Sequence, residues 1–206
     1  MNLVSLPRAM AVAVTCAVAL LTGCSGDGGT SDGGSELPMG WIEREDEPTG
    51  VVFAMPPPVS EPEEREREGR ATPVVSRTYT ANTGALLFSV QFLSTPSEPT
   101  ALEDEVRVDR VPYFLIDEME LAEQVQVDVL SNQVVMDAEV PTYDARLQLT
   151  SGPEEGIWAM RSRELDGLLV VSQVVAIVEG DREEVEAQVS TAFDRLNDTV
   201  RLPEAS

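Results

Sequence analysis

The stretch LLVVSQVVAIV, residues 168–178, decides which fold the sequence predicts. Apolar residues fill both sets of alternating positions, and polar side chains stand only at Ser172 and Gln173. Side chains of a strand point alternately to the two faces of its sheet, so a strand with one solvated face alternates apolar and polar residues. We therefore expect a central strand that is covered on both faces.

Three more strands are predicted in the second half of the chain, before this central strand. We expect a turn at 151–156 between the middle pair, and Asp166-Gly167 is a strong signal for a type I′ turn in the last hairpin. These strands are expected at 127–136, 143–150 and 157–164.

The first half of the chain predicts four strands. Asn82-Thr83-Gly84 is a good hairpin turn between the last two. The segment 56–70 is rich in Pro, Glu and Arg and is expected to form an exposed loop, with a short solvated helical turn as one alternative for 62–70. The strands are expected at 40–44, 51–55, 74–81 and 85–93.

Apolar residues at helical spacing follow each group of strands. Thr100 to Glu103 has the pattern of a capping box, and the apolar positions continue to Val125, with a kink or a new helix at Pro112. A last helix is expected to begin at Asp181, with an apolar face of Val185, Val189, Ala192, Phe193 and Leu196. This order predicts an α+β fold in which helices flank an antiparallel β-sheet.

The N-terminus has the features of a secretory leader. Its only charge is Arg8, and an uncharged, mainly apolar run over 9–23 is too short to span a membrane. The run ends in Leu21-Thr22-Gly23-Cys24, which resembles the lipobox of bacterial lipoprotein precursors. This resemblance implies that a peptidase recognises Leu21, Thr22 and Gly23, and that Cys24 carries a diacylglycerol. An ordinary secretory signal with an incidental cysteine is the alternative.

These features divide the chain into three parts. We expect a lipoprotein signal peptide over 1–23, a lipidated Cys24 followed by a flexible Gly/Ser/Asp-rich tether over 24–39, and a single globular domain over 40–203. Cys16 lies in the leader, so Cys24 has no disulfide partner in the mature chain, and lipidation accounts for it. The domain is then expected at the extracytoplasmic face of the cell membrane, held there by acyl chains.

Composition excludes several common functions. The chain has 37 acidic residues, 14 Arg, no Lys and no His, and its net charge is −23; loss of residues 1–23 removes one Arg and gives −24. A Ser-His or Cys-His nucleophile, a His-ligated metal and a Lys Schiff base are all excluded. The strong negative charge argues against binding to nucleic acid. We expect no catalytic residue, no metal and no cofactor.

Three pieces of sequence resemble the PsbP-like family of α/β/α sandwiches. They are GVVFAMP at 50–56 before a proline-rich loop, RSRELDGLLVVSQ at 161–173, and the F-x-R-L pattern at 193–196 in the last helix. Many lipoproteins of high-GC Gram-positive bacteria look similar, and Arg without Lys also indicates a high-GC genome. The resemblance implies binding or scaffolding at a membrane, and it implies no individual site residue.

Several residues have both a functional and a structural interpretation. Arg161 and Arg163 form an anion site or, as we favour, pair with acidic residues at a sheet edge. Trp41, Tyr143 and Trp158 line a pocket or belong to the core, and the sequon Asn197-Asp198-Thr199 is expected to carry no meaning. The acidic groups Glu61, Glu63 and Glu64, and Glu103, Asp104 and Glu105, are expected to be solvated faces.

Three functions remain open from the sequence. The first is a membrane-anchored binding or assembly module of the cell envelope, whose protein partner is expected to be basic because the domain is acidic. The second is a small-molecule or lipid carrier with a cleft between the sheet and a helix. The third is a carboxylate-dependent hydrolase, which requires two carboxylates at one groove, one of them with a raised pKa.

Overall fold

The computed structural model describes residues 37–67, 74–94, 125–137, 140–165 and 168–201 of the chain. These residues form nine strands and one helix, with the bounds β1 Ile42–Asp46, β2 Val51–Met55, β3 Glu63–Arg67, β4 Val74–Asn82, β5 Leu87–Ser94, β6 Gln126–Asp137, β7 Val140–Ser151, β8 Glu154–Leu165, β9 Leu168–Ile177 and α4 Arg182–Thr199.

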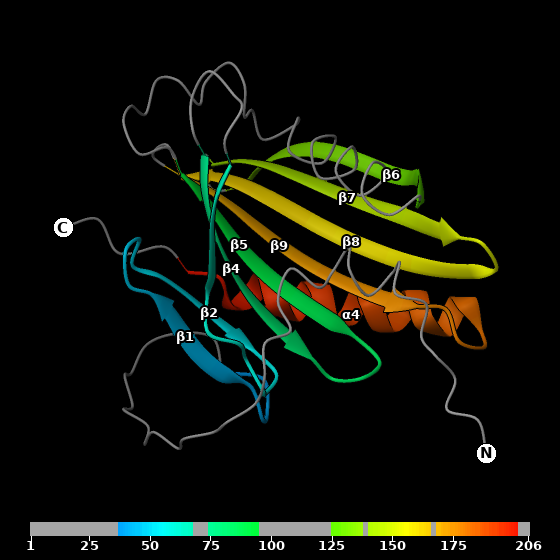
Figure 1. The fold of residues 1–206 in the computed structure, drawn as a ribbon. Coiled ribbons are helices and arrows are strands. Elements are labelled where there is room, and N and C mark those ends of the chain that lie inside the picture. Colours follow the sequence, from blue (N-terminus) through cyan, green and yellow to red (C-terminus); the bar gives the residue numbers. More distant parts are fainter. Residues whose placement is uncertain (1–36, 68–73, 95–124, 138–139, 166–167, 202–206) are drawn as a thin grey trace.

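The described strands form one large sheet and one small hairpin. Seven of them pair in the order β3-β4-β5-β9-β8-β7-β6, and β1 pairs with β2; every pair is antiparallel. Strand β9 lies in the middle, between β5 and β8 (Figure 1). Its side chains are buried on both faces, with Val170 and Val174 in one cluster and Leu169 and Val171 in another. The expectation of a doubly covered central strand is confirmed.

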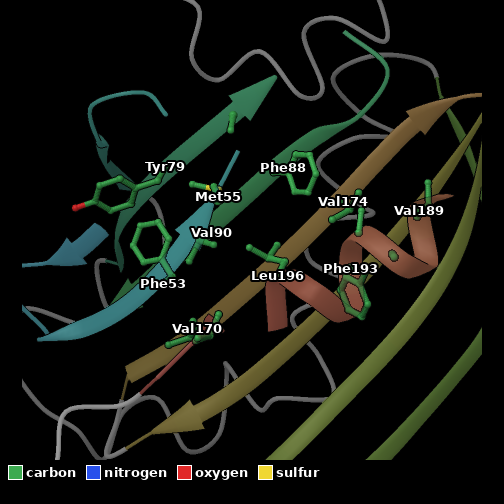
Figure 2. Packing of buried hydrophobic residues seen from close by; sticks show 14 of the residues in the cluster. Phe53, Met55, Tyr79, Phe88, Val90, Val170, Val174, Val189, Phe193 and Leu196 are labelled. Carbon is green, nitrogen blue, oxygen red and sulfur yellow. The ribbon is translucent and has the colours of Figure 1, made fainter. Parts of the chain in front are cut away.

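Helix α4 covers one face of the sheet, which we call the helix face. The carboxylate of Asp181 caps the helix by accepting a hydrogen bond from the Glu183 backbone N–H at 2.9 Å, so the helix begins where the sequence predicts. The predicted apolar side of the helix packs on β8, β9 and β2. Figure 2 shows Phe193 and Leu196 beside Val170 and Val174 of β9, in a cluster that extends to Phe53 of β2.

The hairpin β1–β2 covers the helix face over strands β4 and β5. Asp46, at the end of β1, is fully buried and joins the hairpin to β4: Arg77 donates two hydrogen bonds to its carboxylate, at 3.0 and 2.8 Å, and the Tyr79 hydroxyl donates a third at 3.2 Å. After α4, the backbone of Arg201 exchanges two hydrogen bonds with the backbone of Val52 in β2. The hairpin is therefore held at both of its strands.

The opposite face of the sheet is also apolar and buried. Its cluster contains Leu93, Val125, Tyr143, Ala145, Leu147, Leu149, Trp158, Met160, Leu169 and Val171. In the part of the chain that the structure describes, a helix lies on the helix face alone. The predicted helical segment with the Thr100–Glu103 capping box and Pro112 falls outside the described residues, as does the predicted turn at 166–167.

Two local predictions are wrong. Residues Glu63–Arg67 were expected in a loop or helical turn but form β3, an edge strand paired with β4, because pairing with an existing sheet outweighs the weak strand propensity of Glu and Arg. The turn expected over 151–156 is shorter, since Ser151 already pairs with Glu154.

The predicted hairpin turn at Asn82 is confirmed. The side-chain carbonyl of Asn82 accepts a hydrogen bond from the backbone N–H of Gly84, which has φ +89°. No described helix is long and apolar enough to cross a membrane.

Candidate functional site

The sheet extends beyond helix α4 and presents polar side chains there. Arg146 of β7 faces the helix, and residues directly opposite one another on neighbouring strands share a face. By this register Ser131 lies opposite Arg146 and Gln133 opposite Asp144. We call the resulting surface the polar shelf; it comprises Gln126, Asp128, Ser131 and Gln133 of β6 and Arg146 and Gln148 of β7, and its β6 residues are exposed.

Strand β6 also carries exposed apolar side chains, and by the register Val129 and Val134 lie on the face opposite to the polar shelf, across from Leu147 and Tyr143. Val129, Leu130 and Val134 of β6 are 45%, 47% and 57% exposed, and the strand has a register shift between Val129 and Ser131. Large apolar side chains gathered on one exposed element are a common mark of an interaction surface. Strand β6 also ends the order of the described sheet.

Arg161 forms the ion pair that the sequence favoured. Its Nε and one terminal nitrogen donate to the two carboxylate oxygens of Asp144 at 2.6 and 2.7 Å, across the β7–β8 register. The predicted position at a sheet edge is wrong, because β8 lies inside the sheet between β7 and β9. Arg163 shares the face of Arg161, opposite Thr142.

Arg146 and Arg161 both lie over the ring of Phe193 from α4. Their guanidinium carbons are 4.4 and 5.6 Å from the ring centroid, within the range of a cation–π contact. Phe193 lies on the side of α4 that packs on the sheet, and it is completely buried there. Burial lowers the pKa of Arg146 below its ordinary value, although the nearby carboxylates of Asp194 and Asp144 act in the opposite direction.

The aromatic residues proposed for a pocket belong to the core. Trp41 packs edge-on against Phe88 in the cluster of the helix face, with ring centroids 5.5 Å apart. Tyr143 and Trp158 are buried in the cluster of the opposite face, so the three rings do not line one cavity. The indole N–H of Trp158 is buried and has no hydrogen-bond partner in the described part of the chain.

The sequon at Asn197 is closed to modification. Its side chain is buried, accepts a hydrogen bond from the Ser172 hydroxyl at 2.6 Å and donates one to the Phe193 carbonyl at 2.8 Å. Thr199, the third sequon residue, donates to the Leu196 carbonyl at 2.7 Å and accepts from the Ala54 N–H at 3.0 Å. The burial of Asn197 and Thr199 agrees with the interpretation that this motif is incidental.

The acidic residues that the structure describes do not form a catalytic or metal centre. Glu61 and Glu64 are exposed near the sheet edge, and Glu63 pairs with Arg65. Asp46 is the buried acidic residue among those described, and its pKa is lowered, whereas a general acid needs a raised one. Within the described ranges no three potential ligands group around a metal position. Glu103, Asp104 and Glu105 fall outside these ranges.

The predicted anchor also lies outside the described residues. This applies to Leu21, Thr22, Gly23 and Cys24, to the signal peptide 1–23 and to most of the tether 24–39. Met39, at the start of the described chain, is fully exposed.

Comparison with solved structures identifies the fold class. The cyanobacterial PsbP protein (CyanoP) of Synechocystis sp. PCC 6803 aligns with a TM-score of 0.55 and 16% identity over 84% of this chain and 98% of that one. This similarity shows the fold alone, and it confirms the expected likeness to PsbP at that level. No protein-family model and no curated protein sequence matches the chain.

Two weaker similarities carry no argument. The Ran-binding protein Mog1p of Saccharomyces cerevisiae aligns with a TM-score of 0.49 and 10% identity over 80% of this chain and 96% of that one. LpqN of Mycobacterium tuberculosis, which is involved in cell envelope biogenesis, aligns with a TM-score of 0.36 and 10% identity over 84% of this chain and 87% of that one.

The sequence carries a local signal for the polar shelf. Polar Asp144, Arg146 and Gln148 alternate with apolar Ala145 and Leu147 within the predicted strand. Such alternation predicts one solvated face. The contact between Arg146 and Phe193 has no comparable signal, because it joins residues far apart in the sequence.

Proposed function

We propose that this chain is a lipid-anchored lipoprotein at the extracytoplasmic face of the cell membrane, where its domain acts as a binding or assembly module of the cell envelope. The observation that carries the binding role is strand β6 at the end of the described sheet, which exposes the apolar side chains Val129, Leu130 and Val134 in addition to the polar shelf on its helix face. The anchoring role rests on the lipobox-like Leu21-Thr22-Gly23-Cys24.

The proposal includes a complete α/β/α arrangement. The apolar cluster around Leu147 and Trp158 needs a cover to remain out of water, and the amphipathic pattern from Thr100 to Val125 supports a helical layer there. With the opposite face covered in this way, the polar shelf would be the part of the sheet that remains exposed, on the helix face.

The anchor is tested by changing Cys24. We expect Cys24→Ser to move the protein from the membrane fraction to the soluble fraction and to abolish incorporation of an alkyne-tagged fatty acid, since two or more acyl chains provide most of the membrane affinity. Cys16→Ser is the matched control, because this cysteine lies in the leader and its loss leaves both readouts unchanged. Membrane retention and labelling of the Cys24→Ser protein would refute the anchor.

The binding role is tested by native mass spectrometry of protein mildly extracted from its own membranes. We expect a second polypeptide with the wild-type protein, and its loss when Val129, Leu130 and Val134 are all replaced by Ser. Met39→Ser serves as the control, because Met39 is fully exposed and lies away from β6 in the sequence. A wild-type protein that repeatedly carries no polypeptide would remove the support for a binding module.

The same spectrum tests the carrier function. The buried Trp158 N–H without a hydrogen-bond partner in the described chain favours this second candidate, because a carbonyl of a bound small molecule would satisfy it. A discrete small mass beyond the anchor, lost on Trp158→Phe, would support the carrier.

A further inference from the structure

Arg146 and Arg161 share one aromatic ring but differ in their hydrogen bonds. Both guanidinium groups lie over Phe193, and Arg161 is held by two short hydrogen bonds to Asp144. Arg146 has no hydrogen bond and no ion pair with any residue that the structure describes. Asp144, its neighbour on β7, is already engaged by Arg161.

The ring contact leaves the N–H donors of Arg146 without an acceptor among the residues that the structure describes. A cation–π contact uses the flat face of the guanidinium, whereas its five N–H groups lie in the plane and point outward. Burial and, to a smaller extent, the nearby charge of Arg161 lower the pKa of Arg146, and the carboxylates of Asp194 and Asp144 offset this only in part. An acceptor at the edge of the group would supply what is missing.

The surroundings of these donors suit a peptide. Ser131 lies opposite Arg146, and Gln133 is the next residue of β6 on the same face, so neutral hydroxyl and amide groups border the cation on the sheet. The nearby acids Asp128 and Asp194 are both exposed. They, and the net charge of −23, repel a dianion more strongly than a single carboxylate.

We propose that Arg146 binds one carboxylate of a partner peptide segment that lies along the polar shelf. This inference rests on the proposed binding function and defines the chemistry of its partner: an isolated Asp, Glu or chain terminus among neutral or basic residues. The planar carboxylate accepts two parallel hydrogen bonds from the guanidinium, and basic neighbours in the segment face the shelf's own acids.

The occupancy of Arg146 is tested by labelling the full-length protein with phenylglyoxal, which modifies accessible guanidinium groups, followed by peptide mass spectrometry. We expect Arg146 to be protected in native membranes and labelled once the protein has been separated from its partner. Arg44 of β1, which is exposed, is the control and should label equally in both states. Equal labelling of Arg146 in both states overturns the proposal, and so does protection of the separated protein by inorganic phosphate but not by acetate.

The energetic role of Arg146 is tested with a benzophenone amino acid at Gln133, used to crosslink the full-length protein in cells. We expect Arg146→Met to reduce the crosslinked adduct about tenfold or more, and Arg146→Lys, which keeps the charge without the bidentate geometry, to reduce it less. Arg44→Met should leave the adduct unchanged. Equal free energies of unfolding for Arg146→Lys and the wild type would exclude a folding defect as the cause.

The outcomes separate this inference from the function on which it rests. If the Arg146→Met protein forms as much adduct as the wild type, the binding module stands and the carboxylate site falls. If the adduct maps to a partner segment whose carboxylate can be replaced by its amide without loss, the site also falls. Absence of any adduct and of any second polypeptide with the wild-type protein overturns both proposals.

Discussion

Asp46 illustrates how one residue joins two parts of the fold. The sequence marks it only as one acid among many, yet it is fully buried, where Arg77, Tyr79 and Thr49 all donate hydrogen bonds to its carboxylate. Burial alone would raise the pKa of Asp46, but these hydrogen bonds and the charge of Arg77 outweigh it and lower the pKa. The ionised carboxylate therefore holds the β1–β2 hairpin against β4.

We predict that Asp46→Asn destabilises the protein by about 2–4 kcal/mol, because the amide leaves the Arg77 charge without its partner in a buried site. Urea unfolding at pH 7 measures the difference. Glu45→Gln, at the exposed neighbouring position, should change the free energy of unfolding by less than about 0.5 kcal/mol. Similar losses for both variants would contradict a specific role for Asp46.

At the scale of elements, α4 is the best determined by local sequence. Asp181 caps it, and Glu183 and Glu184 lie in its first turn. Of its five predicted apolar residues four are buried and Val185 is partly buried. We predict that Asp181→Ala costs about 1 kcal/mol, as for other N-cap replacements. Thermal unfolding is the measurement, and Glu179→Ala, just outside the helix, is the control; an unchanged midpoint for Asp181→Ala would show that the cap is dispensable.

The elements that were predicted correctly share a strong local pattern. The central strand β9 has apolar residues on both faces, the β4–β5 turn has Asn82 and Gly84, and α4 has a cap and a stripe. Strand β3 has no such pattern: Glu63-Glu64-Arg65 suits solvent, and only the free edge of β4 makes it a strand. Arg146 over Phe193 was equally beyond sequence reasoning, since it depends on where α4 crosses the sheet.

At the scale of the whole molecule, the absence of His and Lys gives an unusual response to pH. Carboxyl groups ordinarily titrate near pH 4 and Lys and Tyr near pH 10, and His, the side chain that ordinarily titrates near pH 6.5, is missing from the chain. Asp46, with its lowered pKa, contributes its stabilisation above about pH 4 and loses it as the pH falls through that lowered value.

The alkaline limit depends on Tyr79. Burial, followed by the charge of Asp46 and the hydrogen bond to it, raises the pKa of Tyr79 to about 12. Because the folded state holds this proton more tightly than the unfolded state, stability falls as the pH rises from about 10 towards 12.

We predict that the free energy of unfolding changes by less than about 0.5 kcal/mol between pH 6 and pH 9, and that it declines above about pH 10. Urea unfolding across this range is the measurement. Tyr79→Phe should flatten the alkaline decline, whereas a slope near neutral pH would mean that a group other than Asp46 and Tyr79 controls stability.

The order of the strands also has a consequence for how the chain is made. Strand β5 pairs with β4 on one side and with β9 on the other, and residues 95–167 separate β5 from β9 along the chain. A polypeptide leaves the ribosome N-terminus first, so β5 must wait for β9 to emerge before its inner edge is paired. Until then the first half contributes only β3, β4 and β5 to the large sheet, and the backbone N–H and C=O groups on one side of β5 have no partner strand. A nascent chain that stalls before residue 168 is thus a substrate for chaperones and proteases rather than a partly working protein.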